Sequence, residues 1–449
     1  MRVYCARWVV PVATPSIVDG AVAVEHGRIA YVGSRADAPD GARVELGDAA
    51  LLPGLVNVHT HLELTAMRGF LEELDFRPWI LRLTAARQAM LTPALLLASA
   101  KAGIAEGLLA GITTYADTSE SGVTIQAMVE MGVRGIMYQE VFGPDPAQCN
   151  TAIAALRGRL AQLQGAQTAR VRLGLSPHAP YTVSDALFVA AAAEARTEGW
   201  PVAVHLAESD AELQLVRDGR GVFGDALRSR GIPVGPRADS PVALLDRLGL
   251  LELRPLLIHC VRVTAPDIRR IAAHDCAVAH CPASNAKLGH GVAPLLALLD
   301  AGVRVGLGSD SVAANNRLDL LDDARLTILM QRAASRRFDA LSSIEALTLA
   351  TRGGAEALGL AHEIGTLEVG KAGDLAAFSL GSPRTTPTFS PEDALVWAAA
   401  GRQASLVVVD GDERVRDGRL VHSPDDAFDA LGRAGAALAE WRRSAGSRA

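Results

Sequence analysis

Two histidines two positions apart, His59 and His61, follow the apolar run 51–56. In an extended strand, residues i and i+2 point to the same side, so both imidazoles project together from one end of the strand. Such a pair is half of a metal site. Because this spacing also occurs by chance, the interpretation depends on further ligands elsewhere in the chain.

Further candidate ligands follow in order along the chain. His205 and His259 each end a short apolar segment, and Asp310 follows a third such segment. Between these segments lie alanine- and leucine-rich stretches, such as 93–110 and 185–198, whose composition suits helices. The middle of the chain therefore alternates between strand and helix.

Counting this alternation gives eight candidate strands. They are Leu55–Val58, Ile112–Ala116, Arg134–Gln139, Val171–Leu175, Val202–His205, Leu256–His259, Ala277–His280 and Val303–Leu307. Eight strand–helix units in about 300 residues match an α/β fold of the (β/α)₈ TIM-like barrel type, whose active sites lie at the carboxyl ends of the strands. The candidate ligands fall at those ends, which a helical bundle or a sandwich would leave unexplained.

The two ends of the chain have a different pattern from the middle, with short valine-rich alternating segments and turn signals. Neither end is large enough to bury a core alone. We expect both to join in a small β-sandwich beside the barrel, with Ala427–Arg443 as a closing helix. The predicted domains are 1–52 for the first part of the sandwich, 53–363 for the barrel and 364–449 for the second part with the helix.

Composition narrows the classes of function. The 449 residues carry a net charge of −6, so there is no basic field of the kind that nucleic-acid binding requires. The five cysteines form no C-x-x-C pair, which is typical of reduced thiols in an intracellular protein. Without a run of 18 apolar residues or a signal-peptide core, the sequence predicts a cytoplasmic protein that acts on a small molecule and binds no membrane.

The candidate ligands offer three imidazoles and one carboxylate. A set made of His59, His61, His205 and Asp310 suits Zn²⁺ or Fe²⁺ with an open position for water. A metal in such a site lowers the pKa of a coordinated water toward neutrality. Taken singly, Asp310 could instead cap a helix and His205 could be a core histidine; their joint position at strand ends favours the metal site.

Three further residues could handle protons or substrate. Glu208, three residues past His205, could carry a proton to the substrate as a general acid and base, or could only stabilise a helix N-terminus. His259 could orient the water or polarise the substrate. His178 could hydrogen-bond the substrate, although its Pro-His-Ala-Pro surroundings could also form only a rigid turn.

Six motifs together resemble the amidohydrolase superfamily, and within it the cytosine-deaminase-like branch of aminohydrolases and chlorohydrolases. The motifs are Pro53–His61, Ser176–Thr182, His205–Glu208, His280–Leu288, Gly308–Ser311 and Gly365–Asp374. The resemblance implies metal ligands at His59, His61, His205 and Asp310, a proton shuttle at Glu208 and a water-orienting histidine at His259. It also implies that Asp310 acts as a base and that the protein is a dimer or tetramer.

The lysines bear on the number of metals. A two-metal amidohydrolase site needs a bridging group, typically a carboxylated lysine at the end of strand four. The only lysines are Lys101, Lys287 and Lys371, and none is near that position. Glu140, after strand three, is the one acidic substitute, and we expect it to be structural or to face the substrate. The sequence therefore predicts one divalent metal, Zn²⁺ or alternatively Fe²⁺.

The residues after the first metal motif suggest a substrate. Glu63, Trp79 and Arg87 are predicted to face it, with Trp79 alternatively a hydrophobic lid and Arg87 a solvated helix face. This arrangement resembles aminodeoxyfutalosine deaminases more than methylthioadenosine/adenosylhomocysteine deaminases, which usually carry a ribose-binding glutamate where Gln88 aligns. Arg87 would then bind an anionic 5′ substituent.

The sequence thus predicts a metal-dependent hydrolytic deaminase of an aminopurine nucleoside with a 5′ extension, such as aminodeoxyfutalosine, methylthioadenosine or adenosylhomocysteine. One alternative is hydrolysis of another nitrogen heterocycle, as in guanine deaminases or triazine hydrolases. A second is a non-catalytic metal-binding relative. Glu208 and His259 argue against the second, because a structural site would be closed by four ligands and would need no proton carrier.

Overall fold

Eight parallel strands form the centre of the computed structural model, which describes residues 1–446. The strands are β6 (Leu55–Thr60), β7 (Ile112–Ser119), β8 (Arg134–Val141), β9 (Val171–Pro177), β10 (Ala203–Leu206), β11 (Leu256–His259), β12 (Ala277–His280) and β13 (Arg304–Leu307). All eight predicted strands are present, with bounds that differ by no more than three residues. The predicted TIM-like barrel is confirmed.

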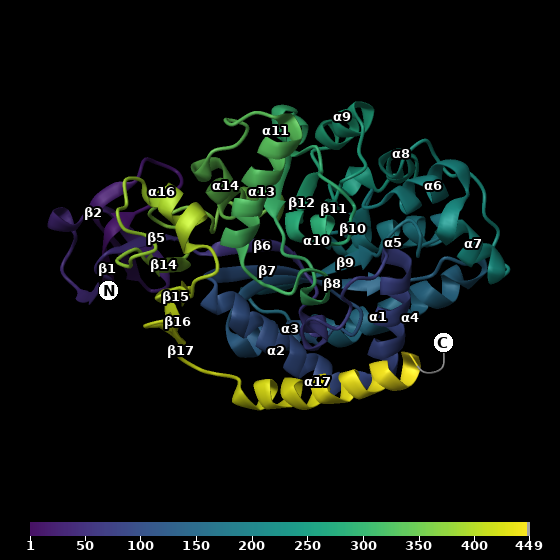
Figure 1. Ribbon diagram of the computed structural model, residues 1–449, viewed down its shortest axis with the longest axis horizontal. Coiled ribbons are helices and arrows are strands. Elements are labelled where there is room, and N and C mark those ends of the chain that lie inside the picture. The colour runs from purple at the N-terminus through teal and green to yellow at the C-terminus, as the bar shows by residue number, and fades with distance from the viewer. Residues whose placement is uncertain (447–449) are drawn as a thin grey trace.

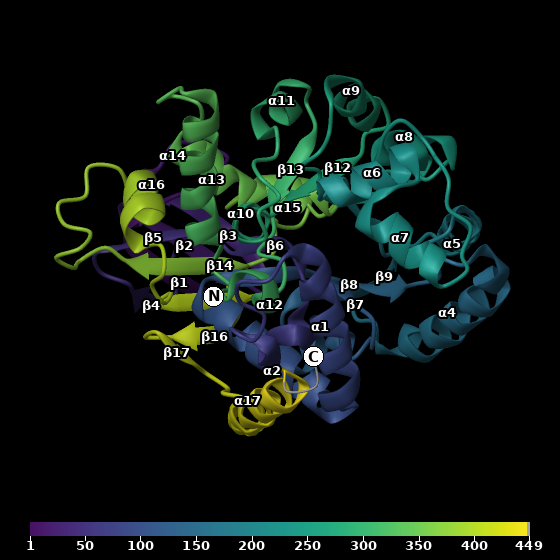
Figure 2. The same cartoon turned by 45° about the vertical axis from the view of Figure 1, so that its right-hand side comes forward.

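The barrel consists of two four-stranded parallel sheets. One has the order β6-β7-β8-β9 and the other β10-β11-β12-β13. Single bridges join the two sheets, Leu175 to Val202 at one seam and Thr60 to Asp310 at the other. Figure 2 shows the strands at the centre with helices around their outer side. Because both seams are closed, all eight carboxyl ends open at the same face.

The helices of the barrel follow its strands. They are α2 (Pro93–Leu109), α3 (Thr124–Met131), α4 (Cys149–Leu163), α5 (Asp185–Glu198), α6 (Asp210–Asp218), α7 (Gly221–Ser229), α8 (Pro241–Arg247), α9 (Ala265–Ala273), α10 (Pro282–Lys287), α11 (Leu295–Asp300), α12 (Val312–Asn315), α13 (Leu320–Ser335), α14 (Ser343–Leu349) and α15 (Arg352–Ala357). Local sequence sets their ends. In α5, for example, Ser184 accepts a hydrogen bond from the backbone of Leu187, and Gly199 ends the helix at a φ of 69°.

Both ends of the chain join in one structure beside the barrel, as predicted, and their strands form a single sheet in place of the two layers of a sandwich (Figure 1). Its strands are β1 (Arg2–Val9), β2 (Ile17–Glu25), β3 (Arg28–Ser34), β4 (Ala42–Glu45), β5 (Ala49–Pro53), β14 (Leu375–Ser379), β15 (Leu406–Val409), β16 (Asp412–Arg416) and β17 (Arg419–Leu420). The order is β17-β16-β15-β14-β5-β1-β2-β3, with β4 beside β1. The antiparallel pairing of β5 with β14 joins the N-terminal strands to the C-terminal ones.

A buried arginine links this terminal sheet to the barrel. Arg134, at the start of β8, donates to Asp374 at 3.0 Å and to Glu363 at 2.9 Å. Asp374 directly precedes β14 and also accepts a hydrogen bond from the backbone of Asp410. Arg134 and Asp374 are both almost fully buried, so the charges of the barrel and the sheet compensate one another away from water.

Two helices, α1 and α17, do not belong to the strand–helix alternation of the barrel. The C-terminal helix α17 (Asp425–Gly446) includes the predicted closing helix and runs along α2, beneath the barrel in the view of Figure 1. The helix α1 (Phe76–Met90) precedes α2 and contacts α17. Among the described residues, no helix has the length and apolar character needed to cross a bilayer. The remaining short helices are η1 (Arg35–Asp37), η2 (Leu62–Met67), η3 (Pro146–Gln148), η4 (Gln164–Ala166), η5 (Leu251–Leu253), α16 (Pro391–Asp393) and η6 (Ala394–Ala399).

Candidate active site

The four predicted ligands come together at the carboxyl ends of three strands. His59 lies near the end of β6 and His61 just after it, while His205 lies on β10 and Asp310 follows β13. His61 Nε2 and His205 Nε2 are 3.3 Å apart. Asp310 Oδ1 lies 3.2 Å from His59 Nε2 and 3.6 Å from His61 Nε2. The ligand atoms of the three histidines lie within 4.8 Å of one another, and the carboxylate lies beside two of them.

The charges of this cluster suit a cation. Burial lowers the pKa of His61 to about 4 and also lowers the pKa values of His59 and His205, so all three rings are neutral at pH 7. Burial alone would raise the pKa of Asp310, but the contact with His59 and the nearby imidazoles hold it below its usual value. Three neutral imidazoles around one carboxylate leave a buried negative charge that a divalent metal would compensate.

Neighbouring polar groups hold the ligand side chains in place. Thr118 Oγ1 lies 3.2 Å from His61 Nδ1 and 3.4 Å from His61 Nε2, so this hydroxyl lies against the ring of His61. Ser284 donates to Asp310 Oδ2, so Oδ1 is the oxygen that faces the histidines. The backbone of Asp310 has a φ of 60°, a left-handed conformation that is uncommon away from glycine and clusters at functional sites. Sequence analysis assigned no role to Thr118 or Ser284.

Glu208 lies beside the ligands, buried in the turn after β10. Its Oε1 is 3.6 Å from His259 Nε2, and His259 Nδ1 is 3.0 Å from Asn285 Oδ1. Since the amide oxygen of Asn285 can only accept, Nδ1 carries the proton and Nε2 presents its lone pair toward the site. Glu212 accepts from the backbone of Glu208 at 2.9 Å and thereby fixes this turn. The predicted proton carrier and its histidine are thus adjacent.

A histidine that sequence analysis missed contacts the same carboxylate. His290 Nε2 lies 3.3 Å from Glu208 Oε1, and both side chains are 5% exposed. The ring of His290 stands edge-on to that of Phe76 at the start of α1, with centroids 4.5 Å apart. No spacing rule marks His290, because it follows α10 in a loop and not the end of a strand.

His178, which sequence predicts to hydrogen-bond the substrate, lies next to His205. Its ring is 4.6 Å from that of His205, and its Nδ1 lies 2.8 Å from Thr182 Oγ1. Its Nε2 points toward Glu140 Oε1, at 3.9 Å. Burial raises the pKa of Glu140 well above its usual value and lowers that of His178 to about 3. The ligand atoms of Glu140, His178 and His205 lie within 4.8 Å of one another.

Arg87 has partners that differ from the prediction. Its guanidinium donates to Glu63 Oε1 at 2.9 Å and to Glu120. The other oxygen of Glu63 accepts from the hydroxyls of Ser119 and Ser121. Two carboxylates already compensate the charge of Arg87, so the geometry gives an anionic substituent no unpaired cation at this position.

Trp79 has the hydrophobic surroundings that sequence analysis gave as its alternative. It is buried in an apolar cluster with Leu64, Met67 and Phe70 of the segment after the first metal motif. Its ring is stacked near that of Phe76, with centroids 6.4 Å apart. Trp79 therefore anchors α1 over the barrel, and Phe76 is the residue that reaches His290.

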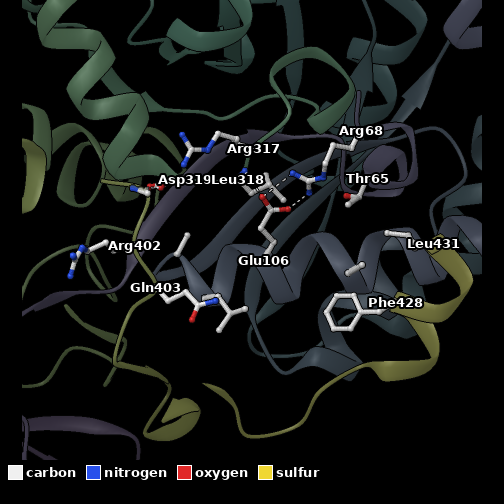
Figure 3. Close-up of a pocket in the computed structure, with 14 residues that line it drawn as sticks. Thr65, Arg68, Glu106, Arg317, Leu318, Asp319, Arg402, Gln403, Phe428 and Leu431 are labelled. Atoms are coloured by element: carbon white, nitrogen blue, oxygen red, sulfur yellow. Dashed lines mark hydrogen bonds and ion pairs between the residues drawn. The ribbon is translucent and has the colours of Figure 1, made fainter. Parts of the chain in front are cut away.

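One surface cavity lies away from the metal-site residues. Figure 3 shows this cavity of about 400 Å³ between α2, α17 and the segment 317–319. Arg68 and Glu106 pair with one another there, and Arg317 pairs with Asp322. None of the metal-site residues lines it. With most of its charges paired and no acid–base group beside a ligand set, it is not the candidate active site.

Comparison with known proteins places this arrangement in a family. The family model described as "Amidohydrolase family" matches residues 50–421, which include all the ligands and Glu208. The chain belongs to the amidohydrolase family. The resemblance seen in the sequence motifs is thereby confirmed.

Individual relatives of this amidohydrolase match over nearly its full length. A 5-methylthioadenosine/S-adenosylhomocysteine deaminase of Moorella thermoacetica is 34% identical over 90% of this chain and 91% of its own. The crystal structure of an adenosine deaminase from Xanthomonas campestris with bound zinc has a TM-score of 0.87 at 29% identity, covering 98% of both chains. That of an atrazine chlorohydrolase from Arthrobacter aurescens, complexed with zinc, has a TM-score of 0.84 at 26% identity, covering 97% of this chain and 100% of the other.

Proposed function

We propose that this amidohydrolase is a zinc-dependent deaminase of adenosine nucleosides that carry a 5′ extension. The observation that carries the proposal is the buried carboxylate of Glu208, which lies beside His259, a member with His59 and Asp310 of one group of possible metal ligands. The name of the Moorella thermoacetica relative supports the substrate class. A proton carrier beside an incomplete ligand shell is what hydrolysis of a C–N bond requires.

The metal would be held by His59, His61, His205 and Asp310, the residues whose donor atoms converge. When bound, zinc supplies Lewis-acid chemistry and lowers the pKa of a coordinated water toward neutrality. We propose one metal per chain, because no lysine of the sequence lies at the end of β9, where a carboxylated lysine would bridge a second one.

The protein groups then move protons. Asp310 takes a proton from the attacking water, whose oxygen forms a bond to the amino-bearing carbon of the purine. Glu208 in its protonated form gives its proton to the neighbouring ring nitrogen. It then takes the hydroxyl proton of the adduct and passes it to the departing amine, and the proton held by Asp310 restores Glu208. The C–N bond breaks, ammonia leaves and the product keeps the oxygen of water as a carbonyl. His259 orients the water through Nε2, because Asn285 holds its Nδ1.

The roles of four substrate-facing residues follow from their places around this centre. We propose that His178 lines the purine pocket beside His205, and that Glu63 and Arg87 act as a pair that shapes its wall. Trp79 closes the pocket through Phe76 as part of α1. The aminodeoxyfutalosine prediction depended on an unpaired Arg87, so methylthioadenosine and adenosylhomocysteine are the substrates that we now favour.

A substrate panel tests the proposal. Zinc-loaded protein is mixed with methylthioadenosine, adenosylhomocysteine, aminodeoxyfutalosine, adenosine, guanine and atrazine, and ammonia and chloride release are measured. We expect the highest kcat/KM with a 5′-extended adenosine. Chloride release from atrazine above ammonia release from every nucleoside would contradict the proposal and favour the activity of the chlorohydrolase relative.

A further inference from the structure

His290 lies in the loop between α10 and α11, where a backbone hydrogen bond and two flanking glycines determine its position. Its backbone N–H donates to the carbonyl of Asn285 at 2.8 Å, so the loop that carries His290 is tied to the residue that orients His259. The flanking Gly289 and Gly291 have φ values of 73° and 97°, which allow the chain to reverse on both sides of the histidine. The backbone therefore presents this ring inward.

The ring of His290 is buried, and its Nε2 lacks an aligned hydrogen-bond partner within the described part of the chain. The charged group nearest to Nε2 is Glu208 Oε1, at 3.3 Å. His280 Nε2 is equally buried and without a partner, but no ion pair with a carboxylate is found for it in residues 1–446. His290 is thus distinguished from an ordinary core histidine by the group that it faces.

Glu208 Oε1 is contacted from two sides, by His290 at 3.3 Å and by His259 at 3.6 Å. In the neutral tautomer that donates from Nδ1 to Asn285 Oδ1, His259 presents Nε2 as an acceptor and does not donate to the carboxylate. His290 is therefore the imidazole able to donate to Oε1. With Oε1 held, Oε2 is the oxygen left to exchange protons with the substrate.

We propose that a small turn of its ring aligns Nε2–H of His290 with Glu208 Oε1, 3.3 Å away, and that His290 is in this way a positioning residue that fixes the carboxylate for proton transfer. The inference rests on the proposed function in that it takes Glu208 as the proton carrier. A carboxylate on a rotatable side chain loses efficiency when it is misplaced, and a displacement of 1 Å can cost about 100-fold in rate. The edge contact with Phe76 keeps the imidazole itself from turning away.

Two substitutions separate positioning from folding. His290→Ala removes the donor, and we expect kcat to fall about 100-fold while KM changes by less than about threefold. His290→Gln places an amide N–H near the position of Nε2 and should restore most of kcat. Equal losses in both variants, or a loss confined to KM, would overturn the inference. Thermal unfolding of each variant shows whether the fold is intact.

His274 provides a matched control. It is also a histidine paired with a carboxylate, Asp246, at 3.1 Å, but it lies at the end of α9 and is partly exposed. His274→Ala should leave kcat and KM unchanged. A loss comparable to that of His290→Ala would show that the rate responds to histidine pairs in general and would contradict a specific role for His290.

A double-mutant cycle tests the link to Glu208. If His290 acts through the carboxylate, adding His290→Ala to Glu208→Gln should cause little further loss, because the step that it supports is already absent. If the fold-losses in kcat of the two single variants multiply in the double variant, His290 acts independently of Glu208 and the inference is overturned.

The contact can also be measured without turnover. In protein labelled with ¹⁵N-histidine and loaded with zinc, the Nε2–H of His290 should give a hydrogen-bonded side-chain resonance that shifts in Glu208→Gln. If the resonance shifts but the protein deaminates no nucleoside, the contact between His290 and Glu208 is supported and the proposed function is contradicted. An unshifted resonance overturns the positioning role even if deamination is observed.

Discussion

Glu208 is the residue on which the chemistry depends most directly. Glu208→Gln keeps the shape of the side chain but cannot transfer a proton, so we expect zinc content to be unchanged and kcat to fall by roughly 10²–10⁴-fold. Metal analysis and ammonia release on the same preparation check both parts. A variant that retains a third of the wild-type rate would show that another group carries the proton.

A substitution of Arg87 distinguishes two roles for this residue: pairing with Glu63 and Glu120, as in the structure, and binding of an anionic 5′ substituent, as predicted from sequence. Because its guanidinium is bound by Glu63 and Glu120, Arg87→Ala should raise KM for neutral and anionic 5′-extended adenosines by a similar factor. Arg82→Ala, an exposed arginine of the same helix, is the control and should have no effect. A selective loss for the anionic nucleoside would instead support the recognition role predicted from sequence.

Residue spacing was informative where backbone periodicity fixes side-chain direction. His59, His61 and His205 could be predicted as ligands because strand ends meet at one face of a barrel. Asn285 and His290 could not, because loop geometry decides where they point and their partners are distant in sequence. The pairing of Arg87 was missed for the same reason, since sequence gives no register between α1 and the turn after β7.

At the scale of elements, Arg134 joins the barrel to the terminal sheet. Replacing it with methionine leaves Asp374 buried without its cation, and we expect a loss of about 3–5 kcal/mol in the free energy of unfolding. Arg172→Met is the control, since Arg172 is more exposed and contacts the same Glu363 at only 3.8 Å. Denaturant unfolding compares the two. Equal stabilities would show that the barrel and the sheet are held together by apolar contacts alone.

The strands of the barrel could be predicted from sequence, whereas the pairings between strands that are distant in sequence could not. Alternating apolar segments located all eight barrel strands, and the valine-rich ends indicated a shared terminal structure. The pairing of β5 with β14 and the single bridge from Thr60 to Asp310 depend on contacts across hundreds of residues. No local propensity encodes such pairings, which depend on how the packed layers fit together.

At the scale of the whole molecule, metal occupancy should set stability as well as activity. We expect one zinc per chain and a lower Tm after chelation, because binding to the folded state alone adds about 4 kcal/mol at a thousandfold excess over Kd. Metal analysis of zinc-loaded protein and thermal unfolding with and without chelator measure both. Two metals per chain, both needed for turnover, would contradict the single-metal assignment.

The division of the barrel into two four-stranded sheets also has a consequence for how such a catalyst could arise. The β6–β9 half carries His59 and His61, and the β10–β13 half carries His205 and Asp310. An ancestral half-barrel of either kind would have held two ligands, too few for a stable zinc centre. Neither half alone would then bind zinc stably, so the bridges that join the two sheets are also what completes the metal site.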